Sequence, residues 1–183
     1  MAMAPEPAAV VRLRVGRSGP IDVERALTVL ELEEIPWLGA RVPGPAGAPA
    51  RRRFHTDLRL PLRADGHEVV LSKAAYVDLG PVRTTDDGCE VEVGWMASSL
   101  APLFPVFAGR LILDARSVRL EGYYAPPGGR LGRAIDRALL GVAARGTARW
   151  FVETVADALG GAGEVAGRPH ATPRLPRQRL ADR

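Results

Sequence analysis

The side chains that could carry out nucleophilic or acid–base chemistry are few and scattered in this sequence. Cys89 is the single cysteine, and the three histidines are His55, His67 and His170. A nucleophilic cysteine or serine needs a base beside it, and no histidine is placed to serve Cys89. Histidines and carboxylates at metal-binding spacings are also missing. We therefore expect no metal, no cofactor and no recognisable catalytic centre, which favours a protein without catalysis.

Lys73 is the single lysine among the 25 basic residues, and it lies in an alternating segment. Between Val69 and Val77 every second position faces one side of a strand, and Lys73 falls in phase with these two residues. A lysine on the core side of a strand could act as a nucleophile or hold an anion. A bulge near Ala75, or a side chain that reaches out to solvent, is the simpler interpretation.

Aromatic residues on predicted inward faces are the candidates for lining an apolar pocket. The predicted ligand-binding residues are Trp95, Phe107, Tyr124, Val142, Gly146, Trp150 and Lys73. Glycine within a helix costs about 1 kcal/mol relative to alanine, so Gly146 suggests either close packing or room for a ligand. The Tyr124 hydroxyl would give such a pocket a polar group. A packed core without a cavity explains the same residues equally well.

The strands that would position these residues follow from a period of two in hydrophobicity. Six strands are predicted, at residues 10–15, 51–62, 69–79, 89–96, 107–114 and 118–124. The sequence Asp86-Asp87-Gly88 is typical of a hairpin turn, and Gly80-Pro81 predicts a kink or bulge. Because the strands follow one another along the chain, we expect them to pair antiparallel.

Helices are predicted after the first strand and after the last strand. A helix is expected over residues 22–32, after Ser18-Gly19-Pro20, and a short turn over residues 33–38. Residues 130–159 are predicted to form one long helix. Its expected inward stripe is Leu131, Ile135, Leu139, Val142, Gly146 and Trp150, extended by Val155 and Leu159. The predicted fold class is α+β, a curved antiparallel sheet of about six strands packed on one long C-terminal helix.

Two stretches in the second half of the chain carry a resemblance to a known family. They are Phe104–Leu111 (FPVFAGRL) and Gly122–Gly128 (GYYAPPG), followed by Gly132 and Asp136. Together with the element order, they resemble the START-like (SRPBCC, polyketide cyclase-like) superfamily, and within it an actinobacterial subgroup without an established activity. The resemblance implies a helix-grip fold with a cavity between sheet and helix that holds an apolar molecule.

Three functions stay open from the sequence. The first is binding of a small or medium apolar ligand in that cavity. The second is an enzyme of the polyketide cyclase or dehydratase type, in which Tyr124 or Lys73 would transfer a proton. The third is a non-catalytic protein-interaction module with a filled core. The oligomeric state is open in all three.

Composition and charge are those of one ordinary globular domain. Hydrophobic residues make up 46% and charged residues 25% of 183 residues, as is usual. We expect a domain over residues 8–159, a disordered N-terminus at residues 1–7 and a disordered basic tail at residues 160–183. The tail holds five arginines against two acids and thus +3 of the net charge of +4. The domain therefore does not carry the basic face that nucleic-acid binding requires.

The expected location is the cytoplasm. The longest apolar run, residues 138–144, is too short to span a bilayer. Residues 1–11 have no basic n-region followed by a long apolar stretch, so no secretory signal is predicted there. A lone cysteine also indicates that disulfides do not build the fold.

Overall fold

The computed structural model describes residues 10–44, 51–64, 67–98, 106–125 and 137–160. Of the predicted disordered ends, residues 1–7 and 160–183, only Gly160 is described, and it forms a bridge with Ile21. Residues 1–7 and 161–183 lie outside the described residues, and so do Phe104, Leu131 and Ile135.

The described chain contains eight strands and two helices. The strands are β1 (Val11–Ser18), β2 (Glu34–Ile35), β3 (Gly39–Val42), β4 (Arg52–Ala64), β5 (His67–Thr85), β6 (Gly88–Ala97), β7 (Val106–Asp114) and β8 (Ser117–Ala125), and the helices are α1 (Val23–Leu30) and α2 (Arg137–Leu159). They form one sheet in the order β1-β8-β7-β6-β5-β4-β3-β2, with antiparallel neighbours. The predicted α+β class is confirmed.

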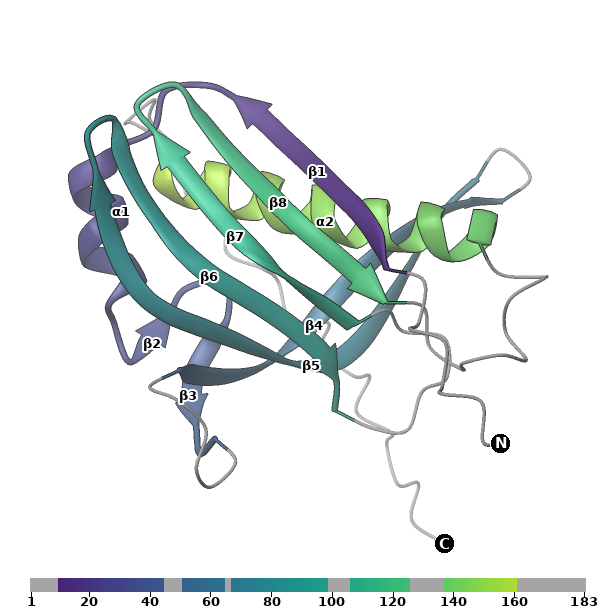
Figure 1. Ribbon diagram of the computed structural model, residues 1–183. Helices are drawn as coiled ribbons and strands as arrows, with labels where there is room; N and C mark the ends of the chain where they lie inside the picture. Colours follow the sequence, from purple (N-terminus) through teal and green to yellow (C-terminus); the bar gives the residue numbers. More distant parts are fainter. Residues whose placement is uncertain (1–9, 45–50, 65–66, 99–105, 126–136, 161–183) are drawn as a thin grey trace, which may run out of the picture.

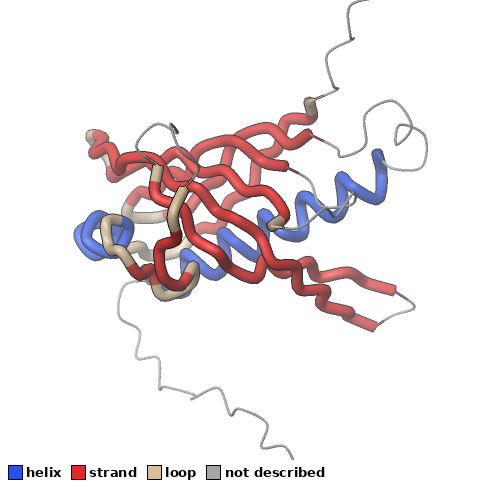
Figure 2. The backbone as a smooth tube through the Cα atoms, turned by 90° about the horizontal axis from the view of Figure 1, so that it is seen from below, coloured by secondary structure: helices blue, strands red, loops and turns tan. Residues whose placement is uncertain are grey.

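The sheet curves around α2, which lies along its concave face (Figures 1 and 2). Helix α2 packs against β1 and β8 at one edge of the sheet and against β4 toward the other edge. Helix α1 lies at the C-terminal end of α2, beside β5, β6 and β7. Within the described residues, neither helix has an apolar stretch long enough to cross a membrane.

The strand count of about six is wrong because of two short strands at the β4 edge. The sequence predicts a helical turn over residues 33–38, but Ile35 pairs with Gly39 and β3 continues to pair with β4. Gly39 has a φ of +78°, a left-handed conformation that glycine adopts at little cost. Strands of two and four residues are too short to show an alternating pattern.

The period of two along the strands also predicts which residues form the concave face, and this prediction is confirmed. The predicted residues, each at most 4% exposed, are Phe54, Leu58, Val91, Val93, Trp95, Leu111, Leu120 and Tyr124. The predicted bulge at Gly80-Pro81 is also present, since the register between β5 and β6 shifts between Leu79 and Val82. The alternation therefore located the face, and the Gly-Pro pair located the bulge.

The predicted inward stripe of α2 is wrong in its phase. Val142 is 60% exposed, and Gly146 and Trp150 are half-buried. The buried positions are Ala143, Ala144, Thr147, Ala148, Phe151, Val152, Val155, Ala156 and Leu159. The helical period is obeyed, and the C-terminal extension of the predicted stripe, Val155 and Leu159, is buried as expected. Before it the helix buries alanines, Thr147 and Phe151 in place of Val142, Gly146 and Trp150.

The C-terminal end of α2 is fixed to the start of the chain. The Asp22 N–H donates to the Leu159 carbonyl at 3.0 Å, and Ile21 forms an isolated bridge with Gly160. Arg17 of β1 donates to the Asp157 carboxylate at 2.5 Å. Asp22 also caps α1 by accepting from the Arg25 N–H. These bonds set the position of α2 along the sheet.

Candidate functional site

A row of directly opposed residues crosses the concave face. Trp95 of β6 lies opposite Phe107 of β7, and Phe107 lies opposite Tyr124 of β8. Val77 of β5 continues the row on the other side of Trp95. Directly opposed residues of an antiparallel sheet place their side chains on the same face. The fold thus brings together three of the predicted ligand-binding residues, which we call the aromatic row: Trp95, Phe107 and Tyr124.

The aromatic row is in contact with α2 through a residue that the sequence analysis did not select. The Trp95 and Phe107 rings stack with centroids 4.2 Å apart, and the Phe151 ring lies 5.7 Å from that of Trp95. Counting back from Leu159 in steps of four would have found Phe151, because Val155 and Phe151 continue the same face.

Two glycines allow the Phe107 ring to lie close to the sheet. Gly109 of β7 is paired with Gly122 of β8. An added Cβ would lie 2.7 Å from Phe107 Cζ at Gly109 and 2.8 Å from it at Gly122. A carbonyl oxygen of the paired strand lies closer still to each added atom, so a side chain at either position would meet both the ring and the backbone. These glycines belong to the two stretches that carry the family resemblance, and they permit the close approach of Phe107 and of the two strands.

The buried face of α2 changes in size along the helix. Between residues 141 and 148, where the side chains of its N-terminal half are described, the buried residues are small: Ala143, Ala144, Thr147 and Ala148. In its C-terminal half they are mostly large: Phe151, Val152, Val155, Ala156 and Leu159. A Cβ added at Gly141 would lie 3.3 Å from the Tyr124 hydroxyl oxygen. The small half therefore begins beside Tyr124 and ends where Phe151 meets Trp95.

Two buried polar atoms, one on the concave face of the sheet and one on the buried face of α2, have no hydrogen-bond partner in the described part of the chain. They are the indole nitrogen Nε1 of Trp95 and the hydroxyl oxygen Oγ1 of Thr147. Trp95 is 3% exposed and Thr147 is 1% exposed. An unsatisfied buried polar group costs about 1–3 kcal/mol, so two of them on one side of the sheet require an explanation.

Lys73 lies on the concave-face side of β5, as the alternation predicts. It is paired with the buried Leu58, and the β4–β5 register runs without a bulge from Lys73 to Val77. Its side chain is half-buried. Strand β6 ends with Ala97, which pairs with Ala75, so Lys73 lies just past the end of β6. Among the described residues no carboxylate forms an ion pair with it.

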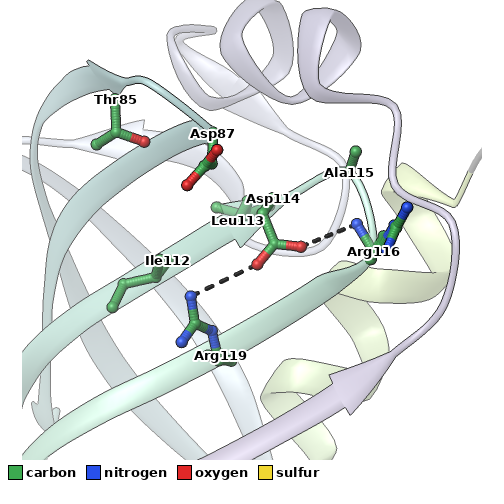
Figure 3. A pocket seen from close by; sticks show the side chains of 8 residues that line it. All are labelled: Thr85, Asp87, Ile112, Leu113, Asp114, Ala115, Arg116 and Arg119. Carbon is green, nitrogen blue, oxygen red and sulfur yellow. Dashed lines mark hydrogen bonds and ion pairs between the residues drawn. The ribbon is translucent and has the colours of Figure 1, made fainter.

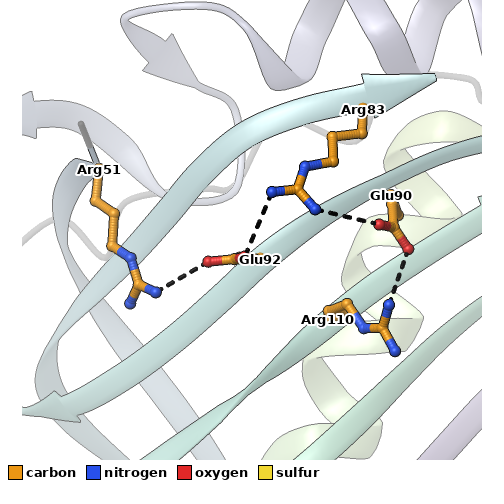
Figure 4. A network of polar contacts seen from close by, with 5 residues as sticks. All are labelled: Arg51, Arg83, Glu90, Glu92 and Arg110. Atoms are coloured by element: carbon orange, nitrogen blue, oxygen red, sulfur yellow. Dashed lines mark hydrogen bonds and ion pairs between the residues drawn. The ribbon is translucent and has the colours of Figure 1, made fainter. Parts of the chain in front are cut away.

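On the convex face, several charged side chains of neighbouring strands pair with one another. In Figure 4, Glu92 accepts from Arg51 at 2.9 Å and lies 3.8 Å from Arg83. Glu90 lies 3.9 Å from Arg83 and 3.3 Å from Arg110. The five side chains form one chain of alternating charge across β5, β6 and β7 and the residue before β4.

A second convex-face cluster surrounds Tyr76. Arg53 makes two hydrogen bonds of 2.7 Å to the Asp78 carboxylate. Its guanidinium carbon also lies 5.1 Å from the centre of the Tyr76 ring, within the range of a cation–π contact. His55 lies beside the same ring. The histidine is thus part of a surface cluster and is remote from Cys89 in the strand register.

Cys89 is fully buried in the core. Burial raises the pKa of its thiol, which disfavours the reactive thiolate. It is paired with Leu113 and Thr84, neither of which can act as a base. The arrangement provides no nucleophile at this position.

An open pocket of about 400 Å³ lies between the β5–β6 and β7–β8 turns (Figure 3). Asp114 in it accepts hydrogen bonds from the Ser117 hydroxyl at 2.7 Å and the Arg116 N–H at 2.9 Å, and Arg119 lies 3.5 Å away. These contacts, with the Ser117 bond first, lower the pKa of Asp114. The Asp114 carboxylate thus finds its hydrogen-bond partners within its own turn. The pocket contains none of the predicted ligand-binding residues.

In comparisons with known proteins, the sequence matched no family model, no curated protein and no solved structure at a significant level. The resemblance to START-like proteins therefore stays a prediction from the two sequence stretches and the element order.

Proposed function

We propose that the protein binds a small or medium-sized, largely apolar molecule between the aromatic row and the N-terminal half of α2. The observation that carries this proposal is the change of side-chain size along the buried face of the helix. The buried residues from Ala143 to Ala148 are small where the helix leaves Tyr124, and they become mostly large from Phe151, which contacts Trp95 at the other end of the row.

The dimensions of this region support the proposal. From Gly141, beside Tyr124, to Phe151, beside Trp95, the helix advances ten residues, or about 15 Å. Across the sheet, Tyr124 and Trp95 are two strand spacings apart, or about 10 Å. The helix therefore crosses the aromatic row obliquely, with its small residues between the two contacts. Aromatic walls with few polar groups are typical of sites for small apolar ligands.

The family resemblance supports the same location, since it implies a ligand between the sheet and the C-terminal helix. We place this binding in the cytoplasm, where a chain with one buried thiol and no disulfide is ordinary.

A reaction of the polyketide cyclase type in the same region is the second candidate. Lys73 favours it, because a half-buried amine on the concave-face side without an acidic partner in the described residues could exchange a proton with a ligand. Tyr124, at the other end of the aromatic row, has its hydroxyl close to α2. A reaction would require a ligand that reaches one of these two groups.

The test fills the proposed space with a larger side chain. Ala144→Leu adds carbon atoms at a buried position of the small half, and Val142→Leu adds volume at an exposed position of the same helix. We expect the wild type and Val142→Leu to bind the neutral fluorescent probe N-phenyl-1-naphthylamine with similar affinity. In Ala144→Leu the affinity should fall at least tenfold while the free energy of unfolding is unchanged or higher.

A filled core gives the opposite result. The wild type then binds no probe, and Ala144→Leu loses about 1–3 kcal/mol, which is the usual cost of overpacking. That outcome would replace ligand binding by the protein-interaction module.

A further inference from the structure

We infer that the ligand of this site is a neutral molecule with an oxygen acceptor, such as a carbonyl, ether or hydroxyl oxygen, set in an otherwise apolar frame. The inference rests on the proposed function and specifies its ligand. Three buried donors lack a partner in the described residues, and the inference follows from the two on the concave side, Trp95 Nε1 and Thr147 Oγ1; the third, Arg119 Nε, lies on the opposite face of β8.

Thr147 differs from the other threonines on the described helices. Thr28 donates from its hydroxyl to the Glu24 carbonyl at 3.0 Å, and Thr154 donates to the Trp150 carbonyl at 2.8 Å. Both use the carbonyl four residues earlier, which every helical threonine has within reach. Thr147 makes no such bond, although it is the most buried of the three. Its hydroxyl is therefore free for a partner outside its own helix.

Trp95 points to the same need from the sheet side. An indole N–H can only donate, and a buried tryptophan usually finds an acceptor. The Trp95 ring is held between Phe107, which stacks on it, and Phe151 of α2. Because these contacts restrict rotation of the ring, its N–H cannot easily turn toward another acceptor of the chain. A molecule bound between the aromatic row and α2 would supply an acceptor.

The surroundings decide the charge of the acceptor. The aromatic row offers no cation, and Lys73 is four residues of β5 away from Val77, the neighbour of Trp95. That separation is about 13 Å along the strand. An ionised carboxylate beside Trp95 would be buried without a counter-ion, which is strongly unfavourable. A pure hydrocarbon would leave both donors unsatisfied. A neutral oxygen acceptor avoids the buried charge and gives the two donors a partner.

The experiment compares two molecules of nearly equal shape, fluorenone, which carries a ketone, and fluorene, which has a methylene group in its place. Each is used to displace N-phenyl-1-naphthylamine. Because a ketone leaves water less readily than a methylene group, fluorene should bind at least as tightly in a site without donors. We expect fluorenone to bind the wild type about tenfold more tightly than fluorene, which is the effect of one or two buried hydrogen bonds.

The variants assign the preference to the two donors. Thr147→Val removes the hydroxyl with little change of shape and should reduce the fluorenone preference at least threefold. Trp95→Phe should do the same. Thr154→Val is the matched control, because that hydroxyl is already bonded within the helix, and it should leave the preference unchanged. Should Trp95→Phe not fold, the comparison of Thr147→Val with Thr154→Val decides alone.

The outcomes separate this inference from the proposed function. Equal affinity of fluorene and fluorenone for the wild type overturns the oxygen acceptor and leaves an apolar site. A preference that survives in Thr147→Val and Trp95→Phe also overturns it. If no probe binds and neither compound has an effect, the proposed function itself has failed.

Discussion

The two faces of the sheet are built from alternate residues of the same strands and treat their polar groups in opposite ways. On the convex face, Glu90 and Glu92 pair with arginines of neighbouring strands (Figure 4). On the concave side, Trp95 and Thr147 keep polar atoms buried with no partner in the described residues. The exposed groups could have been satisfied by water, whereas the buried ones could not.

This difference in polar partners indicates on which face a bound molecule would stabilise the protein most. Exposed ion pairs contribute little to stability, so the convex network is a surface that is complete by itself. Buried donors without partners are costly, and in our proposal a bound molecule supplies the acceptor on the concave side. The comparison can be tested on both faces.

The largest effect is expected from removing the contact between α2 and the aromatic row. Phe151→Ala deletes a ring that is 1% exposed and contacts Trp95. Replacing a buried phenylalanine by alanine typically costs 3–5 kcal/mol, and we expect about that loss in the free energy of unfolding measured with denaturant. Trp150→Ala, at the half-buried neighbouring position, should cost clearly less. If the two losses are equal, the phase of α2 described above is wrong.

A smaller effect is expected from the glycine that seats Phe107. In Gly109→Ala the added methyl group would clash with the Glu121 carbonyl oxygen and lie 2.7 Å from both Phe107 Cζ and Gly122 Cα, so the ring and the β8 backbone must both move. We expect a loss of about 1–3 kcal/mol in chemical unfolding. Gly94→Ala places its methyl group on the convex side, 3.2 Å from the Phe107 carbonyl oxygen, and should cost less. Equal losses would show that the two faces do not differ in packing at these positions.

The convex network should respond weakly. Glu92→Gln removes the charge that pairs with Arg51 and Arg83. Because these side chains are largely exposed, we expect a loss of at most about 1 kcal/mol, which decreases further as salt is added. A loss above about 2 kcal/mol that persists in high salt would mean that this network is part of the core of the fold, against the comparison.

The smallest effect concerns pH. The pKa of Asp114 is lowered, chiefly by the hydrogen bond from Ser117. A lowered pKa in the folded state adds stability above the unfolded value, about 3.9, and that stability is lost as the pH falls through the folded pKa. Asp114→Asn should therefore lose less stability than the wild type between about pH 5 and pH 2. Identical pH profiles of the two proteins would contradict this role of the turn.

The sheet could be predicted from the sequence to a large extent. Strands of eight or more residues show the period of two, and this period placed Trp95, Phe107 and Tyr124 on one face. Their direct opposition could not be predicted, because register depends on the turns, and the residues between β6 and β7 gave no turn signal. The strands β2 and β3 have too few residues for any period to be visible.

The helix side of the site could not be predicted in the same way. Val142 and Trp150 are large apolar residues and suggested an inward stripe, yet α2 buries alanines and Thr147 around Val142 and buries Phe151 in place of Trp150. Alanine is common on both faces of helices, so a run rich in alanine gives a weak periodic signal. A buried threonine without a partner leaves no trace in the sequence. The C-terminal residues Val155 and Leu159 carried the correct phase.

The most direct test of the central claim is the indole N–H resonance of Trp95 in a two-dimensional NMR spectrum of labelled protein. The three tryptophan signals are assigned with Trp95→Phe and Trp150→Phe, and N-phenyl-1-naphthylamine or fluorenone is then added. A ligand between the aromatic row and α2 should shift the Trp95 signal, and fluorenone should shift it downfield as the N–H gains an acceptor. Trp37, which precedes β3, should be unaffected. Binding that leaves the Trp95 signal in place would contradict the account.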